Sequence, residues 1–84
     1  MDFYGVIYKT TNTINGKWYI GKNKGNNENY LGSGKILNKS IKKYGKENFS
    51  KEILAYAHSR EELNHLEKKY IAESNAITDP NSYN

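Results

Sequence analysis

The dipeptide Asn15-Gly16, inside a turn-forming stretch at residues 12–16, constrains the fold more than any other feature of the chain. Asparagine followed by glycine readily adopts the positive φ angles of tight turns, and alternating apolar residues on both sides of it are a strong β-hairpin signal. Residues 3–10 alternate in this way before the turn, and residues 17–22 alternate after it. The sequence therefore predicts that the chain opens with two antiparallel strands.

Two helices and a third strand are predicted after the hairpin. Apolar residues at helical spacing favour a helix over residues 35–43, and Gly45 fits the position just past its end. Alternation over residues 49–56 predicts a strand. The sequence Ser59-Arg-Glu-Glu62 is a capping box, which opens a second helix running to about residue 74. The stretch 23–34, rich in Asn and Gly, is expected to be an ordered functional loop rather than a linker.

The elements and the composition together limit the class of protein. We expect one α+β domain over residues 1–84, with a three-stranded antiparallel sheet flanked by helices in the order β-β-α-β-α. Thirteen basic and nine acidic residues give a net charge of +4, which fits a polyanionic partner such as nucleic acid but also ordinary solubility. The absence of cysteine excludes disulfides and thiolate metal sites. No apolar run is long enough for a membrane span or a signal peptide, so an intracellular, cytoplasmic protein is expected.

Glu67 is a candidate for chemistry because it lies within the apolar face of the second predicted helix. Leu63, Tyr70 and Ile71, which belong to that face, are three or four residues away from it. An ionised carboxylate turned toward a core is unfavourable unless something pairs with it. The pattern alone favours a partly exposed edge position or a buried ion pair with a lysine, and a metal ligand in a cleft is the functional alternative.

Tyr8 and Tyr19 lie in the two strands of the predicted hairpin, and any even-length loop keeps both side chains on one face of the sheet. A two-residue turn at Asn15-Gly16 would pair Tyr19 with Asn12, whereas a four-residue loop over residues 12–15 would pair Tyr19 with Tyr8. Paired tyrosines are more often packing than catalysis. A tyrosine can nonetheless orient or deprotonate water near a bound metal.

Several short motifs, in order along nearly the whole chain, resemble the GIY-YIG nuclease family in its phage-type homing endonuclease form. The motifs are Val6-Ile-Tyr8, Tyr19-Ile-Gly21, Tyr30-Leu-Gly-Ser-Gly-Lys35, Ile41-Lys-Lys-Tyr-Gly-Lys-Glu-Asn-Phe49, the single Glu67, and the closing Asn81-Ser-Tyr-Asn84. The tripeptides alone would be weak, but the glutamate and the terminal asparagine in the same order make the match specific.

The resemblance implies a metal-dependent DNA endonuclease that hydrolyses phosphodiester bonds. Tyr8 would activate or position the attacking water, and Tyr19 would assist it or contact the scissile phosphate. Glu67 would hold one divalent cation, Mg²⁺ or Mn²⁺, because a single carboxylate suits a hard ion that keeps its waters. Asn84 would support the site by hydrogen bonding.

Three departures from the family pattern bear on these roles. Val6 stands where the family has a glycine, with Gly5 displaced by one position, and a strand tolerates this change. The arginine that the family places on its first helix is absent, and so is the histidine near it. His58 and His65 lie elsewhere and are expected to be surface or structural residues. Arg60, the single arginine of the chain, lies next to the cap of the second helix and is expected to be solvent-exposed, with a position that reaches the site as the less favoured alternative.

Lysines dominate the basic residues and are the predicted contacts to the DNA backbone, because such contacts need mobile charges that do not read sequence. Lys22, Lys24, Lys35, Lys39 and Lys42 are the predicted DNA-binding residues, although a solvated helix face would look the same. The expected partner is double-stranded DNA. Its sequence would be read by a C-terminal DNA-binding region outside this chain or through a homodimer. The alternatives are a nucleic-acid-binding scaffold that has lost turnover with its arginine, and a protein-interaction module.

Overall fold

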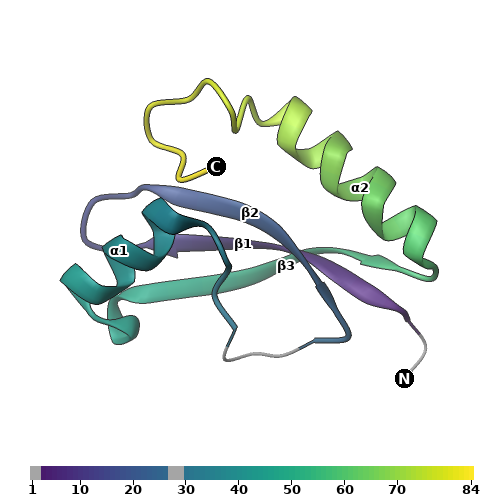
Figure 1. Ribbon diagram of the computed structural model, residues 1–84, viewed down its shortest axis with the longest axis horizontal. Coiled ribbons are helices and arrows are strands. Elements are labelled where there is room, and N and C mark those ends of the chain that lie inside the picture. The colour runs from purple at the N-terminus through teal and green to yellow at the C-terminus, as the bar shows by residue number, and fades with distance from the viewer. Residues whose placement is uncertain (1–2, 27–29) are drawn as a thin grey trace.

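The computed structural model describes residues 3–26 and 30–84, which form a three-stranded antiparallel sheet with helices packed on it (Figure 1). The order of the strands is β2-β1-β3, and their bounds are Gly5–Asn12 for β1, Trp18–Lys24 for β2 and Phe49–Ala57 for β3. The helices are α1 (Lys35–Tyr44), the short 3-10 helix η1 (Lys46–Asn48) and α2 (Arg60–Glu73). The predicted fold class is confirmed, and η1 is the one element among the described residues that the sequence patterns did not indicate.

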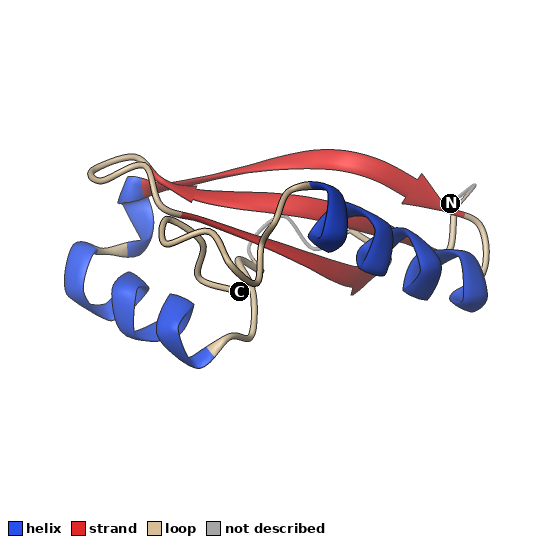
Figure 2. Cartoon of the chain, turned by 90° about the horizontal axis from the view of Figure 1, so that it is seen from above, coloured by secondary structure: helices blue, strands red, loops and turns tan. Residues whose placement is uncertain are grey.

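The helices lie toward opposite ends of the sheet (Figures 1 and 2). Leu63 of α2 packs into a buried cluster with Ile7 and Ile20 on one face of the sheet. The loop before α1 covers the other face, where the Thr10 hydroxyl donates a hydrogen bond to the Leu31 carbonyl at 2.7 Å. The central strand β1 is therefore covered on both sides. Within the described part of the chain, no helix is long and apolar enough to cross a membrane.

The register of the hairpin differs from both alternatives that the sequence offered. Tyr8 pairs with Gly21 and Thr10 with Tyr19, which leaves a four-residue loop at residues 13–16. The two-residue turn is wrong because it needs positive φ at both central residues, and Asn15 is not among the described residues with positive φ, unlike Gly16 at 76°. Tyr8 and Tyr19 consequently share a face as expected, but they are diagonal rather than direct neighbours.

The side chain of Asn12 accounts for the start of the loop at residue 13, one residue later than in the four-residue alternative. Its side-chain oxygen accepts a hydrogen bond from the backbone N–H of Ile14 at 2.9 Å, which satisfies the turn locally. Its side-chain amide donates to the Ser40 hydroxyl at 3.3 Å and to the Tyr83 hydroxyl at 3.1 Å. Asn12 is fully buried, so these bonds hold it in β1 and tie α1 and the C-terminal segment to the hairpin.

The C-terminal segment runs along the outer edge of β2. The Trp18 N–H donates to the Asn81 carbonyl at 2.9 Å, and the Tyr83 N–H donates to the Trp18 carbonyl at 2.6 Å. Trp18 and Ser82 thereby form a parallel bridge. The segment covers one half of an edge strand that would otherwise present unpaired backbone groups.

The capping box begins α2 where it was predicted. The Ser59 hydroxyl accepts from the Glu62 N–H at 3.1 Å, and the Glu62 carboxylate reaches back to the His58 N–H at 2.7 Å. Arg60 is thus the first residue of the helix. The loop predicted over residues 23–34 is shorter than expected at its start, because β2 continues to Lys24, and its residues 27–29 lie outside the described part of the chain.

Candidate active site

Tyr8, Tyr19 and Tyr30 gather over Gly21 on one face of the sheet. The ring centroids of Tyr8 and Tyr19 are 6.4 Å apart, and those of Tyr8 and Tyr30 are 6.2 Å apart. A Cβ atom on Gly21 would lie 2.6 Å from Tyr8 Oη and 2.8 Å from Tyr19 Cε2, closer than such atoms approach each other. The missing side chain at Gly21 therefore lets the Tyr8 ring extend across the edge strand β2, which places its hydroxyl over that strand.

The environment of Tyr8 favours its protonated form. Burial raises the pKa of the Tyr8 hydroxyl well above its ordinary value of 10.0, and nearby Tyr19, Tyr30 and Glu67 raise the pKa further. The ammonium of Lys51 lies 4.5 Å from the centroid of the Tyr8 ring. At neutral pH the Tyr8 hydroxyl is accordingly a neutral phenol, which can donate one hydrogen bond and accept another.

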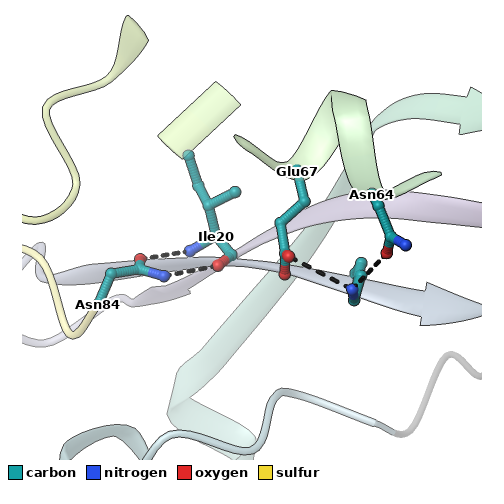
Figure 3. Close-up of polar contacts among 5 residues, drawn as sticks. Ile20, Asn64, Glu67 and Asn84 are labelled. Carbon is teal, nitrogen blue, oxygen red and sulfur yellow. Dashed lines mark hydrogen bonds and ion pairs between the residues drawn. The ribbon is translucent and has the colours of Figure 1, made fainter. Parts of the chain in front are cut away.

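Glu67 reaches the same strand from the opposite face of the sheet. Its Oε1 atom lies 3.5 Å from the ammonium of Lys22, and its side chain is 27% exposed (Figure 3). The same ammonium donates to Asn64 Oδ1 at 2.5 Å (Figure 3). The partly exposed position expected for Glu67 is confirmed, and the lysine paired with it is itself exposed, so the ion pair is not the buried one of the other alternative. Glu67 Oε1 and Asn64 Oδ1, from successive turns of α2, therefore both contact the ammonium of Lys22.

Asn84 binds the backbone of β2 at Ile20, the middle residue of the second tripeptide motif. Its side-chain amide donates to the Ile20 carbonyl at 2.7 Å, and its side-chain oxygen accepts from the Ile20 N–H at 2.8 Å (Figure 3). Asn84 thus contacts the strand in the way a neighbouring strand would. Because Ile20 lies between Tyr19 and Gly21, this contact fixes the backbone that carries the tyrosine cluster.

The predicted site residues meet along β2 at consecutive positions. Asn84 binds at residue 20, the Tyr8 hydroxyl lies over residue 21, and Glu67 pairs with the side chain of residue 22. The charge of Glu67 also raises the pKa of the Tyr8 hydroxyl. The structure therefore brings Tyr8, Tyr19, Glu67 and Asn84 together, although they come from both faces of the sheet and from the C-terminal segment.

The described residues supply few ligands for a metal ion. No group of three or more His, Asp or Glu side chains is found among them. Glu67 Oε1 and Asn64 Oδ1 are nevertheless hard oxygen donors, and the Lys22 ammonium shows that both can face a cation at once. One or two such oxygens with water completing the shell suit Mg²⁺ or Mn²⁺. The residues present thus fit a hydrated divalent cation better than a fully protein-bound one.

The predicted DNA-binding lysines are all exposed but do not form one cluster. Lys35, Lys39 and Lys42 lie on α1, whereas Lys22 and Lys24 lie on β2 beside α2. Lys24 places its ammonium 5.5 Å from the centroid of the Tyr4 ring. Of these lysines, Lys22 is the one that contacts Glu67, and the three on α1 belong to a separate element.

Arg60 is the residue whose position the sequence did not reveal. It is exposed, as expected from its place beside the helix cap. It also lines an open cavity of about 440 Å³ between the first turns of α2 and the edge of β2, together with Lys22, Lys24 and Asn64. The capping box located the start of the helix, but only tertiary packing shows that this start faces the strand that bears Lys22.

The remaining departures from the family pattern have simple structural accounts. Val6 is fully buried in the centre of the sheet, where a β-branched residue packs well. Gly5 takes the crowded position instead, because a Cβ there would lie 2.6 Å from the Asn23 carbonyl oxygen and 2.9 Å from Leu63 Cδ2. His58 and His65 are both exposed, which is the surface position of the two that were expected.

Comparison with known proteins agrees with this geometry. Residues 22–84 match the family model described as "Putative endonuclease segE, GIY-YIG domain". The chain belongs to the GIY-YIG family. Phage T4 proteins named "Putative endonuclease segE" and "Putative endonuclease segB" are each 46% identical to it, over 83 and 84 residues, which are 96% and 98% of this chain. The protein named "Endonuclease segA", also from phage T4, is 34% identical over 83 residues, or 96% of the chain.

The GIY-YIG domain described here spans 40%, 37% and 37% of the length of these three relatives. No solved structure matches the chain. The family and the fold predicted from the motifs are therefore confirmed, and the names of the relatives support the predicted class of enzyme. The roles of individual residues and the metal stay predictions.

Proposed function

We propose that this domain is a metal-dependent DNA endonuclease whose site lies on the edge of β2, between the Tyr8 hydroxyl and the Glu67 carboxylate. The observation that carries the proposal is their meeting at consecutive residues of one strand, Gly21 and Lys22, from opposite faces of the sheet. A phosphodiester that approached this edge would meet a phenol, a carboxylate and an ammonium group together. Such a set suits phosphoryl transfer to water, where catalysis consists mainly of positioning and charge stabilisation.

Tyr8 has the role of orienting the attacking water. Its raised pKa keeps the hydroxyl protonated at neutral pH, so the phenol holds a water molecule by hydrogen bonds and is a poor base in the free protein. Tyr19, whose ring lies beside Tyr8, borders the same position and offers its hydroxyl to the scissile phosphate. Asn84 contributes indirectly, since it holds the backbone of Ile20 between Tyr19 and Gly21.

Glu67, with Asn64 beside it, would hold the divalent cation, Mg²⁺ or Mn²⁺. When bound, such an ion neutralises charge that develops on the phosphate oxygens and on the leaving oxygen. Lys22 occupies this position in the structure and must turn aside when a cation binds, which its exposed ammonium can do. The freed ammonium then lies next to the substrate phosphate. Lys35, Lys39 and Lys42 on α1, with Lys24 on β2, are proposed to contact the backbone of double-stranded DNA further from the scissile bond.

The experiment that tests the proposal is plasmid nicking with Mg²⁺, Mn²⁺ or EDTA, comparing the wild type with Glu67→Gln. Glu73→Gln is a matched control, because Glu73 is an exposed carboxylate at the far end of the same helix. We expect metal-dependent cleavage that Glu67→Gln abolishes and Glu73→Gln preserves. Cleavage by Glu67→Gln at the wild-type rate would contradict the role of this carboxylate. Salt-sensitive DNA binding by a wild type that never cleaves would instead support a binding scaffold without turnover.

A further inference from the structure

We propose that the cavity between β2 and the first turn of α2 binds a phosphate of the DNA backbone, and that Arg60 supplies the guanidinium contact that the first helix lacks. This inference rests on the proposed function, because it assigns the cavity to the same substrate. The cavity has a volume of about 440 Å³ and opens to solvent. It therefore has room for a phosphodiester with some of its bound water.

The charges around the cavity select an anion. Lys22, Lys24 and Arg60 all line it, and no aspartate or glutamate stands among the described residues that do, although the Glu67 carboxylate pairs with Lys22 at 3.5 Å.

The position of the cavity selects the phosphate of the substrate rather than a separate anion. Lys22 and Asn64 line the cavity and also form the contacts with and around Glu67. A phosphate bound there would lie beside the proposed cation, along the same strand edge as the Tyr8 hydroxyl. The DNA backbone carries a phosphate at each step, so the cavity can hold either the scissile group or its neighbour while Glu67 serves the reaction.

Arg60 suits this task better than the lysines that accompany it. A guanidinium presents paired N–H donors in a plane, which match two oxygens of one phosphate, whereas an ammonium acts as a point charge. Arg60 is the single arginine of the chain, and it occupies the first position of α2. The backbone N–H groups of the first helical turn also favour a nearby anion. The arginine contact would thus come from the second helix of this domain.

The test is DNA binding by Arg60→Gln, measured by fluorescence anisotropy with a short labelled duplex in EDTA over a series of salt concentrations. Lys69→Gln is the matched control, because it removes one positive charge from an exposed position on the same helix that does not line the cavity. We expect Arg60→Gln to weaken binding roughly tenfold or more and to lower the slope of log affinity against log salt by about one. Lys69→Gln should leave the slope unchanged. Arg60→Lys should keep the slope yet bind more weakly than the wild type, since it preserves charge without the paired donors.

Equal behaviour of Arg60→Gln and Lys69→Gln would overturn the assignment, and full affinity in Arg60→Lys would overturn the guanidinium contact. Circular dichroism melting of each variant checks that folding is unchanged, since Arg60 is exposed. The two proposals fail separately. Loss of binding in Arg60→Gln without any metal-dependent cleavage by the wild type would keep the phosphate cavity and reject the nuclease. Cleavage that depends on Glu67, together with wild-type DNA binding by Arg60→Gln, would keep the nuclease and reject the phosphate cavity.

Discussion

Replacing Asn84 by aspartate or alanine should destabilise the domain in two ways that differ with pH. The Asn84 side chain makes one accepted and one donated hydrogen bond with the backbone of Ile20, at 2.8 and 2.7 Å. Each bond of this kind contributes about 0.5–1.5 kcal/mol net. Asn84→Ala loses both and should cost about 1–3 kcal/mol, which lowers the melting temperature of a domain of this size by at least roughly 4 °C.

Asn84→Asp keeps the acceptor but places a second oxygen against the Ile20 carbonyl, where the wild type has a donor. Near pH 7 the carboxylate repels that carbonyl, so this variant should be at least as unstable as Asn84→Ala. Protonation restores a donor, so the folded state binds the proton more tightly and the pKa of the new carboxyl lies above its unfolded value of about 3.9. The stabilisation is present below that value and is lost as pH rises through the folded pKa. The deficit relative to the wild type should therefore shrink on acidification.

The assay is urea denaturation followed by the fluorescence of Trp18, at pH 7 and near pH 4. Trp18 is a suitable probe because its backbone pairs with the same C-terminal segment. Asn81→Asp is the control, since Asn81 is exposed and this substitution adds the same negative charge to the same segment. A difference between the Asn84→Asp and wild-type free energies of unfolding that stays constant or grows toward pH 4 would refute the reasoning. So would Asn84→Ala within about 0.5 kcal/mol of the wild type.

Two further predictions concern the tyrosine cluster. Gly21→Ala should cost about 1–3 kcal/mol in a urea titration, because its Cβ would lie 2.6 Å from Tyr8 Oη and must displace the ring; unchanged stability would mean that the ring does not cross β2 there. Tyr8 holds its proton in the folded state above the ordinary pKa of 10.0, mainly through burial, so its contribution to stability is fully present below about pH 10 and is lost as pH rises further. Tyr8→Phe should therefore lose stability less steeply than the wild type between about pH 9 and 11, and parallel curves would show that Tyr8 ionises equally in both states.

Local patterns in the sequence were sufficient for the elements and insufficient for the turn. Alternation located the strands, and Ser59 with Glu62 located the start of α2, because these signals act between residues close in the chain. The register of the hairpin depends on Asn12, whose buried amide is held by Ser40 and Tyr83, 28 and 71 residues away. Turn propensity at Asn15-Gly16 could not reveal those partners, and tertiary contacts prevailed over it.

The same distinction applies to the candidate site. The resemblance to the family predicted Tyr8, Tyr19, Glu67 and Asn84 as residues of one site. Helical spacing alone also indicated Glu67, because it is a charged residue within an apolar helix face. Nothing local distinguishes Arg60 from any exposed residue at the start of a helix. Its place on the cavity follows from how α2 crosses the sheet, which brings Leu63, one turn later, into the core beside Ile7. The sequence therefore made a solvent-exposed Arg60 the favoured prediction over an Arg60 that reaches the site.

The hydrogen bonds along β2 explain why this edge of the sheet suits the proposed site. In an antiparallel strand, residues alternate between those that bond the neighbouring strand and those whose backbone groups point away from it. The backbone N–H and C=O groups of Trp18 and Ile20 point away from β1, and the C-terminal segment forms hydrogen bonds with both residues. The same alternation directs the backbone of Lys22 and Lys24 outward, beside the cavity that Arg60 lines. The covered half of the edge fixes the tyrosines, and the half beside the cavity presents N–H groups and ammonium groups together. An edge strand that would be a liability elsewhere is thus suited to receive a chain of phosphates.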